Sequence, residues 1–229
     1  MLSWFSKLFK RGVGDDGAQL RAYRRLRARY DAAVTNSDNY RHWANADGLS
    51  ADAAASPEVR RILRNRARYE VANNSYAKGI VVTLANDLIG TGPRLQMLTT
   101  DAAANRLVEH EFANWAQAVN LAEKLRTMRM ARAEDGEAFA VLANNERLAS
   151  PVSLDLRLAE ADQVTTPDLS LGQTNAVDGI VFDEFGNPRE YHGLRQHPGG
   201  LGSVFDTAYD RIPARSMIHF YRCDRPGQS

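Results

Sequence analysis

The segment Leu121–Leu142 has the sequence LAEKLRTMRMARAEDGEAFAVL, and it contains the change of pattern that decides the fold. Its first part carries apolar side chains at helical spacing, from Leu121 to Met128 and beyond. Gly136 then interrupts this pattern, and glycine commonly ends a helix. Phe139–Leu142 follows as a short apolar run typical of a strand. The segment therefore predicts a helix before Gly136 and a strand after it.

Upstream of this segment, apolar residues recur with the period of a helix. Ser56-Pro57-Glu58 is a strong helix start, with serine as the N-cap and proline at the first helical position. The helix that it opens is predicted to run to about Leu88 and to end at Gly90–Pro93. Arginines crowd its first half, whereas its second half is apolar and is expected to be buried. Further helices are expected around Val108–Val119 and, earlier, around Leu20–Val34.

Downstream of Gly136 the period of the pattern changes to two. Val152–Leu158 alternates apolar and polar residues and is the clearest half-buried strand. Ile180–Phe182 and Arg189–His192 flank a polar loop, which predicts a hairpin with more than two loop residues. A last strand is expected at Met217–Arg222. We therefore predict an α+β fold, in which long N-terminal helices precede a small, mostly antiparallel β region.

The same changes of pattern predict three regions in this chain of 229 residues. Residues 1–55 are expected to form a basic helical arm and loop, residues 56–135 a helical region, and residues 136–229 a β-rich region. Such a length can bury a sizeable core as one large domain or two small ones.

Charge is distributed unevenly along the sequence. The whole chain holds 29 Lys+Arg and 28 Asp+Glu. Residues 1–80 carry 15 basic and 8 acidic side chains, a net charge of +7, and the remaining residues carry 14 and 20, a net charge of −6. Arginine outnumbers lysine by 25 to 4, which suits phosphate or carboxylate partners and is equally the product of a GC-rich genome. Opposite signs in the two parts suit contacts between neighbouring subunits as well as contacts with DNA.

The sequence predicts no disulfide and no membrane partner. Its single cysteine, Cys223, cannot form an internal disulfide or a multi-cysteine zinc site. No run approaches the roughly 18 apolar residues that span a bilayer. Met1–Lys10 is apolar with basic flanks, so it could seek a membrane surface, but docking on the protein itself or on a neighbour is the simpler interpretation.

Motifs for catalysis, cofactors or metals are not found in the sequence. Gly90-Thr91-Gly92 has two glycines of a dinucleotide-binding loop, but it follows a helix and is better interpreted as a helix stop. His192 and His197 lack ligand spacing and are interpreted as surface or packing residues. The acidic residues Glu134, Asp135 and Glu137 could serve a metal-dependent nuclease, but a solvated turn is the simpler interpretation. We therefore expect a protein that is not an enzyme, with no catalytic residue, cofactor or metal.

The first half of the predicted helix from Ser56 carries an unusual density of arginine. The candidate contacts to DNA or to a neighbouring subunit are Arg60, Arg61, Arg64, Arg66 and Arg68. Arginines with nearby aromatic residues, such as Tyr69, can contact a nucleic-acid backbone without reading its sequence. The alternative for each arginine is an ion pair with an acidic partner.

Several segments together resemble one family. They are YRHWANAD (Tyr40–Asp47), SPEVRR (Ser56–Arg61), LRNRARYE (Leu63–Glu70), NNSYAKG (Asn73–Gly79), NDLIGTGP (Asn86–Pro93), EADQV (Glu160–Val164), IPA (Ile212–Ala214), HFYR (His219–Arg222) and RPGQ (Arg225–Gln228). In this order they resemble the lambda-type family of tailed-bacteriophage portal proteins. The stretch from Asn65 to Pro93 is specific, whereas the later pieces are weaker when taken alone.

The resemblance implies a structural protein that is not an enzyme. Its homo-oligomeric ring, usually of twelve subunits, sits at one vertex of the capsid shell in the virion, after assembly in the host bacterial cytoplasm. A terminase motor threads double-stranded DNA through the ring, and a head–tail adaptor later joins it. The matched part of the chain forms the α+β wing in this family.

Family members continue well past the sequence RPGQ into the channel helices, the clip and the crown. The chain stops at Ser229, one residue after this sequence, so we expect a truncated portal that would not assemble a working ring. A prophage remnant, a frameshifted reading and an excised fragment are the alternatives for its origin. The alternative function is an independent nucleic-acid-binding module, without sequence specificity, that uses the basic helical half.

Overall fold

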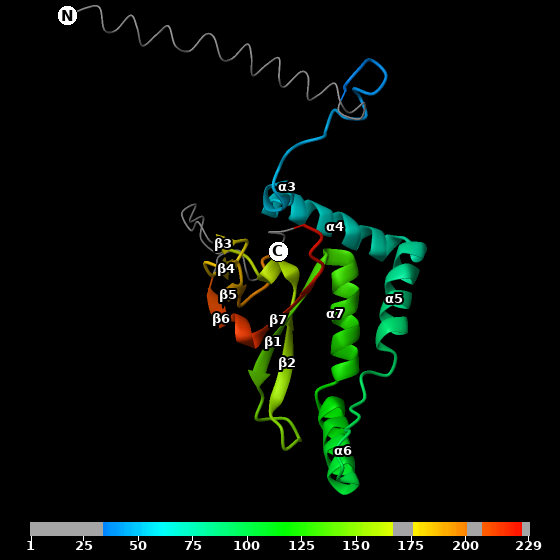
Figure 1. Ribbon diagram of the computed structural model, residues 1–229, viewed down its shortest axis with the longest axis vertical. Helices are drawn as coiled ribbons and strands as arrows, with labels where there is room; N and C mark the ends of the chain where they lie inside the picture. The colour runs from blue at the N-terminus through cyan, green and yellow to red at the C-terminus, as the bar shows by residue number, and fades with distance from the viewer. Residues whose placement is uncertain (1–33, 167–175, 201–207, 226–229) are drawn as a thin grey trace, which may run out of the picture. The chain divides into compact units, whose positions relative to one another are not determined.

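The computed structural model describes residues 34–166, 176–200 and 208–225 (Figure 1). The chain divides into two compact units, Met1–Gly48 and Leu49–Ser229. The segment Met1–Lys10 and nearly all of the helix expected at Leu20–Val34 lie outside the described residues. The division of the second unit at residues 55 and 135 stays a prediction.

Helices make up the first part of the second unit. They are α3 (Ala51–Ala54), α4 (Pro57–Asn73), α5 (Ser75–Ile89), α6 (Ala102–Ala118) and α7 (Leu121–Asp135). Ser56 caps α4 as predicted, because its hydroxyl accepts a hydrogen bond from the N–H of Val59 at 3.5 Å and Pro57 opens the first turn. The helices expected before and after Val119 are confirmed.

The helix predicted as one piece from Ser56 to about Leu88 is in fact two helices. Asn74 separates α4 from α5, and its backbone is extended, with φ −117° and ψ 111°. Its side-chain oxygen accepts hydrogen bonds from the N–H groups of Tyr76 at 3.0 Å and Ala77 at 3.4 Å. Asparagine is a preferred N-cap because its short side chain satisfies such donors. The single-helix prediction is wrong because it rested on the spacing of apolar residues, and that spacing does not reveal a polar capping residue such as Asn74.

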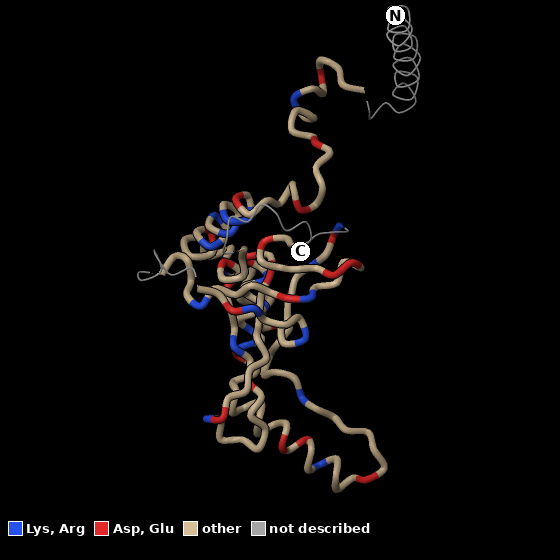
Figure 2. Tube along the Cα trace, turned by 90° about the vertical axis from the view of Figure 1, so that its left-hand side faces the viewer, with Lys and Arg blue, Asp and Glu red and all other residues tan. Residues whose placement is uncertain are grey.

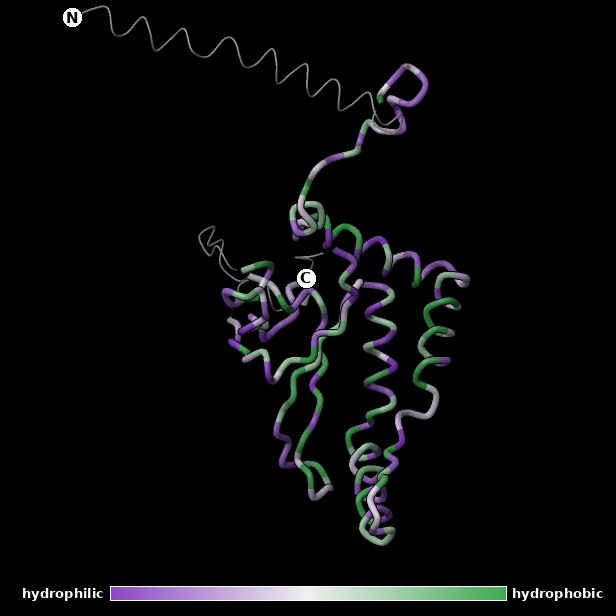
Figure 3. Tube along the Cα trace, viewed as in Figure 1, coloured by the Kyte–Doolittle hydropathy of each residue, from purple (hydrophilic) through white to green (hydrophobic). Residues whose placement is uncertain are grey.

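The prediction that the apolar second half is buried is also wrong. In α5 only Val81 and Ala85 are buried, on the face that packs against α7. Tyr76, Ile80 and other apolar residues of α5 remain exposed. Figure 3 shows hydrophobic residues along much of this helix. The sequence shows that the helix is apolar on most sides. It does not show how many other elements of the same chain pack against those sides.

The change from helices to strands occurs at Gly136, as predicted. Gly136 follows the last residue of α7 in a left-handed conformation, with φ +87°. The elements after it are β1 (Glu137–Asn144), β2 (Leu154–Ala159), η2 (Ala161–Gln163), β3 (Ala176–Val177), β4 (Ile180–Phe182), β5 (Pro188–Leu194), β6 (Tyr209–Pro213), η4 (Ala214–Ser216) and β7 (Met217–Tyr221). Helices followed by strands confirm the α+β class.

The strands form two antiparallel sheets. One has the order β2-β1-β7 and the other the order β3-β4-β5-β6. The predicted hairpin is confirmed, since β4 pairs with β5 and Ile180 lies opposite Tyr191. Its loop holds five residues, Asp183 to Asn187, in which the Asp183 side chain accepts backbone hydrogen bonds.

Both faces of the β2-β1-β7 sheet are covered, because successive side chains point to opposite faces. Ala138 and Ala140 of β1 lie in a core with α6 and α7, together with Leu156 of β2. Phe139 and Val141, on the other face, lie in a second core that contains residues of β4, β5 and β6. The sheet therefore lies between a helical layer and the second sheet (Figure 1).

A two-residue turn joins β3 to β4. Asp178 and Gly179 both have positive φ, at +42° and +84°, as the hairpin turn of an Asp-Gly pair requires. A Cβ atom on Gly179 would lie 2.6 Å from backbone atoms of Thr165. Glycine is therefore required here both by the backbone conformation and by the close approach of another segment.

Candidate functional site

Helix α4 carries the candidate arginines, and its geometry divides them into two groups. Arg60, Arg64 and Arg68 follow one another at intervals of four residues, so they lie on one face of the helix. We call these three residues the arginine row. Arg61 and Arg66 are exposed and lie off this row. Figure 2 shows basic and acidic positions interspersed around α4.

Arg64 is the buried centre of the arginine row, with 6% of its surface exposed. Its Nη2 donates a short hydrogen bond to Glu137 Oε1, and its Nη1 lies 3.5 Å from Asp162 Oδ1. Burial would raise the pKa of Glu137, but the hydrogen bond with His219 and the charges of Arg64, His219 and Arg60 outweigh it. The pKa of Glu137 therefore lies below its ordinary value, and the group is a carboxylate.

His219 belongs to the same buried network. Its Nε2 lies 2.9 Å from Glu137 Oε2, and its ring stacks between Phe139 and Tyr221 at centroid distances of 4.4 and 4.2 Å. On the other edge of the ring, Nδ1 lies 3.5 Å from the Tyr191 hydroxyl. Burial raises the pKa of Tyr191 to about 12, and the charges of Tyr221 and Glu137 add to this effect. The network therefore ties α4, β1, β5 and β7 together.

Arg68 makes the most directional contacts of the row. Its Nε and Nη2 donate to the two oxygens of Asp135 at 2.7 and 2.9 Å, and its Nη1 donates to Asp162 Oδ2 at 2.6 Å. The hydrogen bond to Asp135 raises the pKa of Arg68, although burial opposes it. Paired N–H donors on one carboxylate give both strength and a fixed orientation. Arg68 thus joins α4 to the end of α7 and to η2.

Arg60 extends the row to the turn between β3 and β4. Its Nη2 lies 3.3 Å from Asp178 Oδ2 and 3.9 Å from Asp52 Oδ1. Asp178 could not be recognised as a partner from the sequence, because a turn residue 118 positions away carries no helical or strand pattern. The row therefore contacts carboxylates from α3, α7, β1, η2 and the β3–β4 turn.

The acidic residues considered for a nuclease lie in this network. Asp135 is bound by Arg68 and Glu137 by Arg64, so the interpretation of the cluster as a solvated turn is wrong for both. Burial and the charge of Asp135 raise the pKa of Glu134 above its ordinary value. Carboxylates held by guanidinium groups in this way are poorly placed to bind a divalent cation, and loss of either partner would leave the other charge unpaired.

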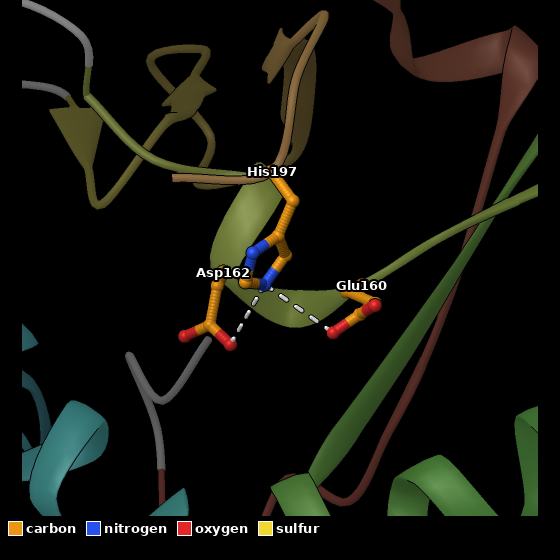
Figure 4. A group of neighbouring side chains, drawn as sticks. All are labelled: Glu160, Asp162 and His197. Carbon is orange, nitrogen blue, oxygen red and sulfur yellow. Dashed lines mark ion pairs between the residues drawn. The ribbon is translucent and has the colours of Figure 1, made fainter. Parts of the chain in front are cut away.

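A second cluster joins His197 to two carboxylates (Figure 4). Its Nε2 lies 3.3 Å from Glu160 Oε2 and 3.6 Å from Asp162 Oδ2. Two acids and a histidine could in principle hold a metal. However, the N–H of Gly199 donates to His197 Nδ1 at 3.0 Å, which places the ring proton on Nε2, and Arg68 already occupies Asp162. This chemistry favours a polar contact between the neutral imidazole and the two carboxylates, which the sequence missed because both acids lie more than thirty residues before the histidine.

The exposed arginines of α4 have different surroundings. Arg61 pairs with Glu58 one turn earlier, at 2.7 Å, and both side chains are largely exposed. Arg66 and Tyr69 share the outward side of the helix, and both are exposed. Ion pairs therefore account for Arg60, Arg61, Arg64 and Arg68, which is the alternative that the sequence had left open. Contacts of the five arginines with DNA or another subunit stay a prediction.

In the part of the chain that the structure describes, no helix combines the length and the apolar character needed to cross a membrane.

The sequence of this chain is similar to those of known phage proteins. Residues 37–229 match a family model described as phage portal protein, lambda family. Over 185 aligned residues the chain is 29% identical to a probable portal protein of Halomonas phage phiHAP-1. The alignment covers 73% of this chain and 35% of that relative. The chain thus spans about a third of the length of the curated relative that it matches.

Proposed function

Because the chain belongs to the lambda family of phage portal proteins, we propose that it is a structural head–tail connector protein of a tailed phage or prophage. In this proposal it contributes to a ring at one capsid vertex, through which DNA is packaged and ejected. The observation that carries the proposal is the family match over residues 37–229, which includes every described helix and strand.

The proposed partners follow from this role. They are other copies of the same protein in a ring, the capsid shell protein, double-stranded DNA, and the terminase and head–tail adaptor of the complete portal. The proposed place of action is the virion, after assembly in the host cytoplasm. We propose no catalytic role, in agreement with a structural family and with acidic residues that are held by arginines.

Within this proposal the arginines of α4 have two roles. The arginine row holds the helical layer on the β layer inside one subunit, as its ion pairs support. Arg61 and Arg66 are the candidates for contact with DNA or a neighbouring subunit, since both are exposed. An Arg→Glu change in the row should therefore damage folding and assembly more than it changes DNA affinity.

The proposal is tested on phage particles from cells that encode the chain. An antibody against the exposed β4–β5 loop, detected by immunogold electron microscopy, should label particles at a single vertex. A matched control uses particles from cells in which the reading frame is deleted. Particles that lack the protein, or that are labelled evenly over the shell, would refute the portal role.

A second candidate function is a module that binds nucleic acid without sequence specificity. The exposure of Arg66 beside Tyr69 favours it, since cations and aromatic rings together bind a nucleic-acid backbone. It predicts binding to duplex DNA that falls steeply as salt rises. Filter binding at two salt concentrations measures this, and the absence of binding at low salt would remove the candidate.

A further inference from the structure

The dipeptide Asp-Gly occurs at four places in the chain, and the structure gives these places different surroundings. They are Asp16-Gly17, Asp47-Gly48, Asp135-Gly136 and Asp178-Gly179. The first of them lies outside the described residues. In such a dipeptide the glycine nitrogen can attack the carbonyl carbon of the aspartate side chain, because glycine has no Cβ atom to block the approach.

This attack converts aspartate into isoaspartate in two steps. The nitrogen forms a bond to the side-chain carbon, which closes a five-membered succinimide ring, and the amide hydrogen leaves with the carboxyl hydroxyl as water. Water then adds to the main-chain carbonyl carbon and breaks its bond to the nitrogen, so the chain runs through the former side chain. The nitrogen must first come within about 3–3.5 Å of the carbon, which requires freedom of both the side chain and the backbone.

The fold removes this freedom from Asp135. Its two carboxylate oxygens accept hydrogen bonds from Nε and Nη2 of Arg68 at 2.7 and 2.9 Å, and its side chain is 9% exposed. Asp135 is also the last residue of α7, and Gly136 is fixed in a left-handed conformation. The carboxyl group cannot rotate towards the Gly136 nitrogen without breaking both hydrogen bonds.

Asp178 is held in a different way. Its Oδ1 accepts a hydrogen bond from the Thr165 hydroxyl at 3.0 Å, and its Oδ2 lies 3.3 Å from Nη2 of Arg60. The attacking nitrogen is engaged as well, because the N–H of Gly179 donates to Thr166 Oγ1 at 2.9 Å. Both reacting groups are therefore held in place by other parts of the fold.

Asp47-Gly48 lies in open surroundings. Both residues are exposed, and residues 46–50 belong to no helix, strand or turn. None of the described residues accepts a hydrogen bond from the N–H of Gly48. A Cβ atom placed on Gly48 would meet nothing within 4 Å, so the space around the nitrogen is free. The backbone here has the freedom that the reaction requires.

We propose that Asp47 is a site of spontaneous isomerisation to isoaspartate, and that the fold protects Asp135 and Asp178 from the same reaction. The product adds one CH₂ group to the main chain at the boundary between the compact units Met1–Gly48 and Leu49–Ser229. The reaction uses only solvent water and does not depend on the portal function.

The test is peptide mapping of the full 229-residue chain after incubation at neutral pH. Trypsin cleaves after Lys and Arg, so each Asp-Gly lies in its own peptide, namely residues 12–21, 42–60, 133–147 and 158–189. Mass spectrometry with electron-transfer fragmentation locates isoaspartate in each peptide. We expect it to form at position 47 at least about tenfold faster than at positions 135 and 178, because those two must first open locally.

Two controls separate the effect of the fold from that of the sequence. Gly48→Ala fits the structure, since the φ of Gly48 is not left-handed and a Cβ atom meets nothing there. It should slow the reaction at Asp47 about tenfold or more and leave the circular dichroism unchanged. In concentrated urea the wild-type chain should form isoaspartate at positions 47, 135 and 178 at rates within about threefold of one another.

Three results would overturn the inference. The first is a native chain in which the three positions react at equal rates. The second is a native rate at Asp47 that rises tenfold or more in urea, since the fold would then protect this position too. The third is an order of rates that persists in urea, because the sequence alone would then set it. Labelling of a single vertex of the particle would support the portal role whichever of these results is found.

Discussion

The buried pair of Arg64 and Glu137 offers the sharpest test of how α4 is held. Arg64→Met keeps much of the side-chain volume and leaves Glu137, which is 8% exposed, without its guanidinium partner. Removing one member of a buried ion pair costs about 3–5 kcal/mol. His219 still contacts Glu137 at 2.9 Å, so we expect the lower end of this range, about 3 kcal/mol of unfolding free energy at neutral pH.

This loss should depend on pH with a definite sign. The pKa of Glu137 is lowered in the native state, so its carboxylate contributes stability above the unfolded pKa of about 4.3. That contribution is lost as the pH falls through the native pKa. Without Arg64, the pKa of Glu137 rises, because burial then acts with less opposition. The difference in stability between wild type and variant is therefore largest near neutral pH and shrinks below about pH 4.

Urea unfolding followed by circular dichroism measures both effects. Arg61→Met is the matched control on the same helix, and it should leave the unfolding free energy nearly unchanged because its pair with Glu58 is exposed. The double variant Arg64→Met/Glu137→Leu should recover part of the loss, because no carboxylate is then left buried. A cost below about 1 kcal/mol for Arg64→Met, or a cost that does not change with pH, would refute the reasoning.

Further predictions concern single contacts, and the same unfolding assay tests the first two. Gly179→Ala should cost at least about 3 kcal/mol, because its φ is positive and its Cβ would meet backbone, whereas Gly186→Ala, also at positive φ but in open space, should cost about 1 kcal/mol. Equal costs would contradict this reasoning. Arg68→Ala should cost about 2 kcal/mol and Arg66→Ala less than about 0.5 kcal/mol, and the reverse order would count against the arginine row. Burial raises the pKa of Tyr191 to about 12, so its stabilisation is complete below about pH 10 and is lost as the pH rises through 12. An ultraviolet titration should show a late ionisation step that Tyr191→Phe removes, and a single step near the ordinary value would contradict it.

Local signals in the sequence were sufficient for the elements whose ends depend on one or two residues. Ser56-Pro57 begins α4, and Gly136 ends α7, because capping and left-handed backbone are properties of the residues themselves. The cap at Asn74 is the same kind of signal, but it lies within a continuous apolar pattern that favours one helix. The exposure of α5 could not be predicted in the same way, because burial depends on the number of neighbours that pack on a helix.

The partners of the arginines could not be predicted from spacing. A row of three arginines at intervals of four residues indicates one face of a helix, but not whether that face meets solvent, DNA or protein. Glu137 and Asp162 lie 73 and 98 positions from Arg64 in the sequence. Only the packing of β1 and η2 against α4 brings them together. His219 and His197 join the network for the same reason, and no motif marks either one.

The packing also changes what the charge distribution means. Residues 1–80 have a net charge of +7 and residues 81–229 a net charge of −6, which suggests a basic half available to DNA. The arginine row lies in the basic half, yet its guanidinium groups contact Asp135, Glu137, Asp162 and Asp178 of the acidic half. Three cations of the basic half are therefore already paired inside one compact unit. Among the arginines of α4, exposed cations such as Arg66 are therefore the candidates for DNA contact. A guanidinium that is already paired with a carboxylate attracts a phosphate only weakly, because the carboxylate cancels most of its charge.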